Sequence, residues 1–231
     1  MAKNDQLNYL NLAHNSFVGS IPEFFGNLNT DLLPEFPNLS FNQLTGSIPL
    51  SIASFFTKSQ QFDVSNTLSN NLIEGPLPAS IRKLDPAGIF AANTSLTGTV
   101  PSWLASLNSL TRLDISDNQL TGNLPASLMA SRGGTLCPIL SHNKLTGSLP
   151  TSIASLSHCF AGGNSDSYCS KGFLAGNQLS GTLPKSVGSA TFDQLCVSLC
   201  VSHTYLYMRR IVVKHKDLAR TSMLALCEHL A

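Results

Sequence analysis

Charge is scarce in this chain of 231 residues. Asp, Glu, Lys and Arg make up 12% of it, against roughly 25% in an average soluble domain. The 14 basic and 13 acidic residues leave a formal net charge of +1, so no positive field exists to neutralise a phosphate backbone. This composition argues against nucleic-acid binding. No apolar run reaches about 18 residues, so we expect no membrane span. The first residues contain no apolar segment, so we expect no signal peptide.

Motifs for enzymatic chemistry are missing as well. The chain contains no G-x-S-x-G elbow, P-loop, H-E-x-x-H pair or EF-hand loop, and its acidic residues are scattered singly. Hydrophobic residues nevertheless make up 42%, which is enough to form a core. We therefore expect a folded, non-enzymatic protein with no cofactor and no metal.

A repeat governs what is present. The pattern Asn-x-apolar-x-Gly-x-apolar-Pro, first seen from Asn15 to Pro22, occurs seven times at steps of 23 to 34 residues. We call its first residue the ladder position; it is filled by Asn15, Asn42, Asn71, Thr94, Asn118, Asn143 and Asn177. An apolar residue follows each Pro by three positions, and Leu113-x-Ile115 before Asn118 alternates with the period of a half-buried strand.

Each residue type in the repeat has a physical reason to be there. A short strand turns its apolar side chains inward, and the Asn amide at the bend pairs backbone groups that a turning chain leaves without partners. The Gly tolerates the turn, and the Pro fixes φ where the next segment starts. One coil cannot bury its inward face alone, so the pattern predicts stacked coils with their Asn side chains in register.

These residues resemble the plant-type leucine-rich repeat, over roughly residues 7–190. The resemblance implies an α/β solenoid of about seven repeats. Its fold would be a right-handed curved superhelix with a concave parallel β-sheet and a convex side of 3₁₀ pieces and short strands. It also implies an extracellular or cell-surface receptor-like protein that binds a protein or peptide ligand, with a co-receptor as a further candidate partner.

The chain departs from this family in several places. No Cys-paired cap or kinase motif is found, Thr94 replaces Asn, and Pro37, Asn66 and Ile89 stand where a strand Leu is expected. We therefore expect a fragment or a decayed relative, with the solenoid over residues 1–190 and a tail without repeats over 191–231. The imidazoles of His14 and His142 share the position before the ladder residue, which explains them better than catalysis does.

The strand pattern places the binding surface. Residues six, four and two positions before each ladder residue point outward onto the concave sheet. From these we select nine candidate ligand-binding residues: Tyr9, Asn11, Phe36, Phe90, Arg112, Asp114, Ile139, Lys171 and Phe173. Exposed aromatic side chains on such a face are typical of interface hot spots.

Two segments interrupt the repeat. An inserted loop over 157–172 is bracketed by Cys159 and Cys169, which form a disulfide candidate in an oxidising compartment. The tail has three interpretations that stay open: a helical cap over the last coil, a weak membrane anchor followed by basic residues, or non-native sequence from a frame or splice change.

Two N-glycosylation sequons begin at Asn38 and Asn93. The leading hypothesis is a recognition module that binds through the concave sheet. The alternatives are a secreted inhibitor of cell-wall hydrolases, an ice-binding solenoid, or a truncated product without function.

Overall fold

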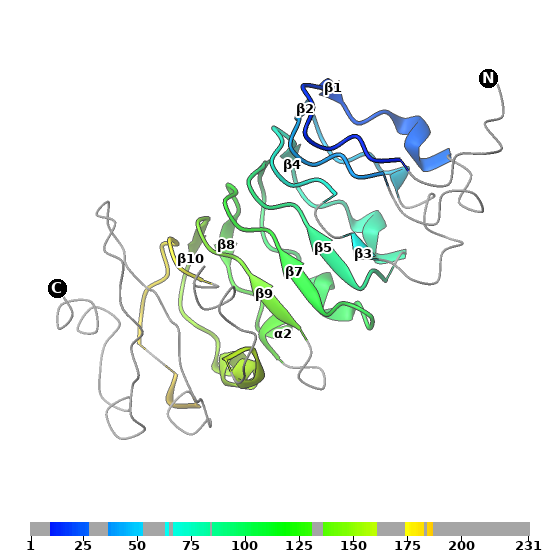
Figure 1. Cartoon of the computed structure of the whole chain (residues 1–231). Helices are drawn as coiled ribbons and strands as arrows, with labels where there is room; N and C mark the ends of the chain where they lie inside the picture. Colours follow the sequence, from blue (N-terminus) through cyan, green and yellow to red (C-terminus); the bar gives the residue numbers. More distant parts are fainter. Residues whose placement is uncertain are drawn as a thin grey trace. The chain divides into compact units, whose positions relative to one another are not determined.

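The computed structural model describes residues 10–27, 37–52, 63–64, 67–83, 85–130, 136–160, 174–182 and 184–186. The chain divides into two compact units: residues 1–98 with 103–118, and residues 99–102 with 119–231. Figure 1 labels α2 and most of the strands. In chain order, the elements are β1 (Val18–Ser20), η1 (Glu23–Asn27), β2 (Gln43–Thr45), β3 (Asp63–Val64), β4 (Glu74–Gly75), η2 (Ala79–Lys83), β5 (Gly88–Phe90), β6 (Ser95–Leu96), η3 (Ser102–Ser106), β7 (Arg112–Asp114), β8 (Thr121–Asn123), α2 (Ala126–Met129), β9 (Cys137–Ile139), β10 (Lys144–Thr146) and η4 (Thr151–Phe160). The predicted tail lies outside the described residues.

In the first unit, the strands that precede the ladder positions form a parallel sheet in the order β3-β5-β7. Ile89 pairs with Leu113, and Phe90 pairs with Asp114. Leu113 and Ile115 are almost completely buried. The parallel sheet and the half-buried strand expected around Leu113 are therefore confirmed.

A second set of short strands follows the ladder positions. β1 pairs with β2 and β4 with β6 in the first unit, and β8 pairs with β10 in the second, all of them parallel. Their register is staggered by two repeat positions, since Val18 lies opposite Gln43 and Thr121 lies opposite Lys144. Each coil with such a pair thus contributes to two separate rows of backbone hydrogen bonds.

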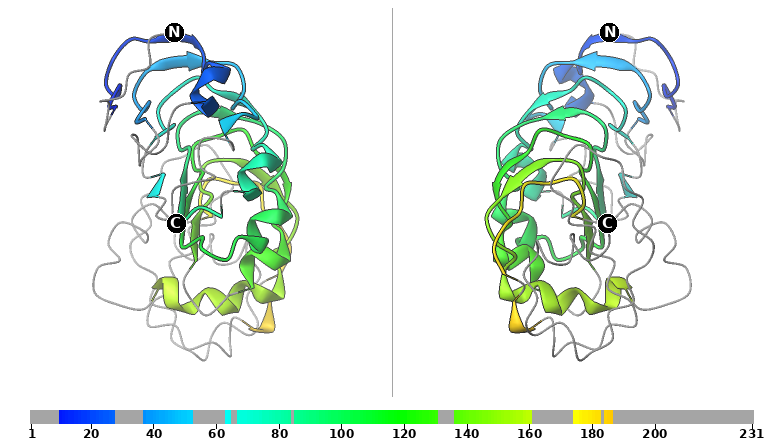
Figure 2. Two further views of the ribbon diagram at one scale, coloured as in Figure 1. Left: turned by 90° about the vertical axis from the view of Figure 1, so that its right-hand side faces the viewer. Right: turned by 90° about the vertical axis from the view of Figure 1, so that its left-hand side faces the viewer.

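In five of the described repeats, the Pro starts a tight turn on the way back to the next coil. Its carbonyl accepts a hydrogen bond from the amide three residues later, as from Pro22 to Phe25 and from Pro78 to Ile81, each at 3.1 Å. This geometry is that of a 3₁₀ turn. The residue that donates is the apolar residue expected three positions after Pro, and it is buried: Phe25, Ile52, Ile81, Leu128 and Ile153. Figure 2 shows the coils of the first unit lying one upon the next.

The ladder asparagines join neighbouring coils in the first unit. The carboxamide oxygen of Asn71 accepts a hydrogen bond from the Leu44 amide of the preceding coil at 3.1 Å. Its nitrogen donates to the carbonyls of Leu39 in that coil and Leu68 in its own, both at 3.0 Å. Asn42 repeats this arrangement with Phe17, Leu12 and Leu39. One buried carboxamide thereby satisfies three backbone groups that the bends leave without partners.

The same contacts recur in the second unit. Asn143 accepts from the Leu120 amide at 2.9 Å, and Asn177 accepts from the Leu145 amide at 3.0 Å. Asn177 also donates to the carbonyl of Leu140 at 3.0 Å. Leu120 and Leu145 are fully buried, so each amide would be costly to leave without an acceptor.

Thr94 interrupts this pattern. Its hydroxyl lies 2.5 Å from the carboxamide oxygen of Asn118, and it does not reach the preceding coil. Ile73, whose amide is the counterpart of Leu44, is only 1% exposed, and no described residue accepts a hydrogen bond from that amide. The sequence signal of a missing Asn therefore corresponds to a missing connection between coils.

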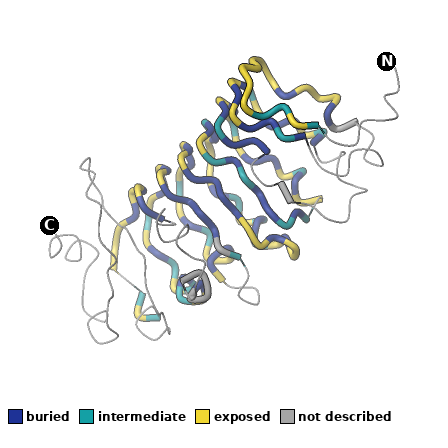
Figure 3. Tube along the Cα trace, viewed as in Figure 1, coloured by how far each residue is buried: buried dark blue, intermediate teal, exposed yellow. Residues whose placement is uncertain are grey.

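The residue before the ladder position, which we call the corner position, always has a positive φ. Its values lie between 51° and 65° for His14, Phe41, Asn70, Asn93, Asp117, His142 and Gly176. This left-handed conformation bends the chain out of the strand, and Asn, Asp, His and Gly tolerate it best. His14 and His142 are thus explained by backbone geometry. Figure 3 shows buried residues along the strands and exposed residues where the coils turn.

Repeat three has a register that the sequence does not reveal. Counting back from Asn71 places Asn66 opposite Ile89, but the structure pairs Val64 with Ile89. From Thr67 onward the normal register holds, because the Leu39 amide donates to the Thr67 carbonyl at 2.9 Å. The repeat therefore contains two additional residues between Val64 and Thr67, and Asp63 takes the place expected for Ser65.

Candidate binding face

The sheet of the first unit brings Phe90, Arg112 and Asp114 together. Phe90 on β5 lies opposite Asp114 on β7, and Arg112 stands two residues before Asp114 on the same face of that strand. Arg112 is exposed, Phe90 is half-buried and Asp114 is 7% exposed. Two adjacent coils thus present an aromatic ring, a cation and a largely covered carboxylate within one small area.

Polar side chains on this face are held by local hydrogen bonds. One carboxylate oxygen of Asp114 accepts from the amide and the hydroxyl of Ser116, at 3.1 and 2.6 Å. Asn38 and Ser40 form the same pair two positions apart, at 3.1 and 2.7 Å. These pairs fix the side-chain conformations before any ligand arrives, which reduces the entropy lost on binding.

The exposure of the predicted residues varies more than strand alternation suggests. Asn11 is exposed, whereas Ile139 on β9 of the second unit is 7% exposed. Two smaller residues on the face of the first unit, Ser40 and Ser116, are each 2% exposed. Neighbouring strands lie only about 4.8 Å apart, so short side chains are covered and long or terminal ones remain open.

Several candidates cannot be placed. Tyr9, Phe36, Lys171 and Phe173 lie outside the described residues, as does Cys169. The backbone of Cys159 belongs to η4, which continues to Phe160 and so includes the first residues of the predicted inserted loop. The disulfide candidate therefore stays a prediction.

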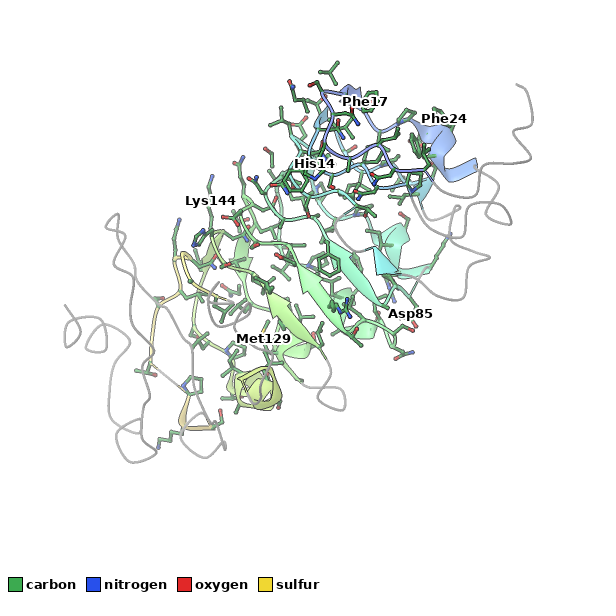
Figure 4. The ribbon with its side chains drawn as sticks, viewed as in Figure 1. His14, Phe17, Phe24, Asp85, Met129 and Lys144 are labelled. Carbon is green, nitrogen blue, oxygen red and sulfur yellow. The ribbon has the colours of Figure 1, made fainter. Side chains whose placement is uncertain are left out.

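The corner positions of the first unit form a largely exposed row that strand alternation does not reveal. The rings of His14 and Phe41 stack with centroids 4.1 Å apart and planes inclined by 12°, and Figure 4 shows His14 on the first coil. Farther along, the Asn93 carboxamide donates to the Asn70 carboxamide oxygen at 2.8 Å. The recurrence of Asn, Asp and His before the ladder position was the available signal.

Over the described part of the chain, no group of three His, Cys, Asp or Glu side chains is placed to hold a metal ion. Within that same part, no helix combines the length and the apolar character needed to cross a membrane.

Comparison with known proteins identifies the repeat. A family model described as Leucine Rich Repeat matches residues 6–28, 109–130 and 139–156. Receptor-like protein 35 of Arabidopsis thaliana is 36% identical over 120 residues, which is 52% of this chain and 10% of the relative. The chain thus spans about a tenth of the length of this curated relative.

Solved structures of plant proteins are similar to this chain in fold. The Arabidopsis receptor kinase HAESA, in complex with the peptide hormone IDA and the co-receptor SERK1, is 26% identical with a TM-score of 0.64, covering 84% of this chain and 30% of the receptor. A plant ice-binding protein is 25% identical with a TM-score of 0.54, covering 77% of this chain and 51% of that protein.

Proposed function

Because the chain carries leucine-rich repeats and resembles plant receptor-like proteins, we propose that it is a non-enzymatic recognition module acting outside the cell or at its surface. Its ligand is a peptide or protein that lies across the sheet of the first unit. The coils follow one another as turns of a solenoid, and the concave side of that solenoid carries the binding face.

The observation that carries this proposal is the likeness, over 84% of this chain, to a receptor kinase in complex with a peptide hormone. The geometry is in agreement. The ladder carboxamides hold neighbouring coils in fixed register, and the Asp114–Ser116 pair fixes the face itself. A surface that is ordered before binding spends less of the interaction energy on its own ordering.

The side chains indicate the chemistry of the ligand. Phe90 contributes a half-buried apolar ring to the face, and the Arg112 guanidinium on the adjacent strand is exposed. A guanidinium binds a carboxylate through two parallel hydrogen bonds. We therefore expect a peptide with an apolar residue next to a carboxylate, either an acidic side chain or the terminal group.

A displayed library of short linear peptides tests the proposal directly. The full chain is used to select peptides, and affinities are then measured for the full chain, Arg112→Gln and Lys144→Gln. Both substitutions remove one positive charge from an exposed side chain, so they change the net charge equally. Lys144 lies on β10 of the second unit, where its ammonium contacts Gln119 at 3.3 Å.

We expect Arg112→Gln to weaken binding about tenfold, which corresponds to about 1.4 kcal/mol, while Lys144→Gln changes it by less than about twofold. Selection of no peptide would contradict the proposal. Equal losses in the two variants would contradict the assignment of the face, because they would show that net charge alone governs binding.

The alternative functions make different use of the surface. An inhibitor of cell-wall hydrolases would capture such an enzyme in a pull-down instead of a short peptide. An ice-binding surface needs an unbroken array of hydroxyl and amide groups, but Lys144 lies directly beside Thr121 in the β8–β10 pair. That charge interrupts the row, and an absence of thermal hysteresis would agree with it.

A further inference from the structure

The two sequons of this chain occupy very different places in the first unit. Asn93 stands at an exposed corner position with φ 51°, two residues before β6 begins. Asn38 is half-buried within the strand region and pairs with Asn11 of the neighbouring coil through an isolated bridge. We propose that Asn93 carries an N-linked glycan and that the fold closes the sequon at Asn38. This inference rests on the proposed function, since it requires passage through the secretory pathway.

The modification is a transfer to the side-chain nitrogen. A lipid-linked oligosaccharide diphosphate supplies the sugar, and the Asn93 Nδ2 forms a bond to the sugar C1 while the bond from C1 to the diphosphate oxygen breaks. The diphosphate leaves with the electron pair, and Nδ2 loses one of its two protons to the transferring enzyme. The sequon hydroxyl that accompanies Asn93 belongs to Ser95.

The local structure accepts a glycan at this position. Asn93 is exposed, and its Nδ2 uses one N–H to donate to the Asn70 carboxamide oxygen at 2.8 Å. A glycosylated amide keeps one N–H, which suffices for that bond. The Asn93 backbone amide donates to the Ser116 carbonyl at 3.0 Å and is not involved in the reaction.

The surroundings of Asn38 are closed by comparison. Its amide donates to the Leu10 carbonyl at 3.2 Å, and its carbonyl accepts from the Leu12 amide at 2.8 Å, so the backbone is paired on the strand side. The carboxamide oxygen is occupied by both donors of Ser40, whose side chain is 2% exposed. An oligosaccharide on this half-buried side chain would therefore lie against the strand face and beside the covered Ser40.

A glycan on Asn93 would also leave the sheet face accessible to a ligand. The corner row lies outside the strand face that carries Phe90 and Arg112, since Asn93 follows β5 by three residues and bends away with positive φ. A bulky, hydrated sugar at this corner is therefore compatible with ligand binding on the sheet, whereas one on Asn38 would lie across it.

The test uses the full chain fused to a secretion leader and expressed in plant or insect cells. Peptide N-glycosidase in heavy-oxygen water converts each occupied asparagine to a labelled aspartate, and mass spectrometry locates the label in protein from both medium and cell lysate. The matched variants are Ser95→Ala and Ser40→Ala, each of which removes one sequon hydroxyl and keeps its asparagine.

We expect most molecules to be occupied at Asn93 and few secreted molecules at Asn38. Ser95→Ala should lower the mass by one glycan, and Ser40→Ala should leave it unchanged. An empty Asn93 in both fractions, while a reference sequon on the leader is occupied, would overturn the inference. So would secreted protein occupied at Asn38 as fully as at Asn93. Because the leader is supplied, an empty site would leave the peptide-binding proposal standing.

Discussion

Asn71 provides the sharpest test of how the coils are joined. It is 5% exposed, and truncation to Ala removes the acceptor of the Leu44 amide and the donor to the Leu68 carbonyl. The Leu39 carbonyl keeps a second donor from Asn42 at 3.0 Å, so it is not left without a partner. Two buried backbone groups therefore lose their hydrogen bonds in the variant.

Each such group costs about 1–3 kcal/mol, so we expect Asn71→Ala to lower the free energy of unfolding by about 3 kcal/mol. With a urea m-value of about 2 kcal/mol per molar, the unfolding midpoint falls by about 1.5 M. The fluorescence of the single tryptophan, Trp103, reports the transition, because it lies in the same unit as Asn71.

Asn15 is the matched control, since it fills the same ladder position on the first described coil. Its carboxamide donates to the carbonyls of Leu12 and Ala13 at 3.1 and 3.0 Å, but these contacts are exposed and water can replace them. Asn15→Ala should therefore cost less than about 1 kcal/mol. Equal losses in the two variants, or a loss below about 1 kcal/mol for Asn71→Ala, would refute the reasoning.

Three further predictions concern neighbouring positions. Thr94→Asn should stabilise the first unit by about 1 kcal/mol in urea unfolding, because a carboxamide there reaches the Ile73 amide; destabilisation would mean that the Thr94–Asn118 contact matters more. Phe41→Asn should raise stability by up to about 1 kcal/mol, because Asn tolerates the left-handed φ of 54° better than Phe; a loss would show that stacking on His14 outweighs backbone strain. Ser116→Ala should weaken selected-peptide binding measurably more than Ser106→Ala, because it removes the hydroxyl that donates to the Asp114 carboxylate on the binding face and leaves the donation from the residue 116 amide, and equal affinities would exclude that pre-ordering role of the hydroxyl.

The sequence predicted the features that follow from chemistry within one repeat. A recurring Asn at a bend implies stacked carboxamides, and Asn42, Asn71 and Asn118 all make the expected contacts. The apolar residue three positions after Pro was visible in the sequence, whereas the 3₁₀ turn that buries it was implied only by the family resemblance. The replacement of Asn by Thr94 was visible in the sequence, and the structure shows which contact between coils it changes.

Features that depend on neighbouring coils were harder to predict. The two additional residues before Thr67 leave the strand propensity of this segment unchanged, so the sequence pattern does not show them. Only the pairing of Val64 with Ile89 shows that the register is displaced. Strand alternation says which way a side chain points but not whether the next coil covers it. Ser40 and Ser116 therefore point outward and are still buried, whereas Arg112 is long enough to stay exposed.

Backbone amide exchange measured by NMR tests most directly whether side-chain carboxamides connect successive coils. The amides of Leu44, Leu96, Leu120 and Leu145 each donate to a ladder asparagine, at 3.1, 2.9, 2.9 and 3.0 Å, and should exchange slowly. Ile73 is equally buried but faces Thr94, so its amide should exchange faster than the amide of Leu44 and should become protected in Thr94→Asn. Exchange of Ile73 as slow as that of Leu44 in the unaltered chain would contradict the account.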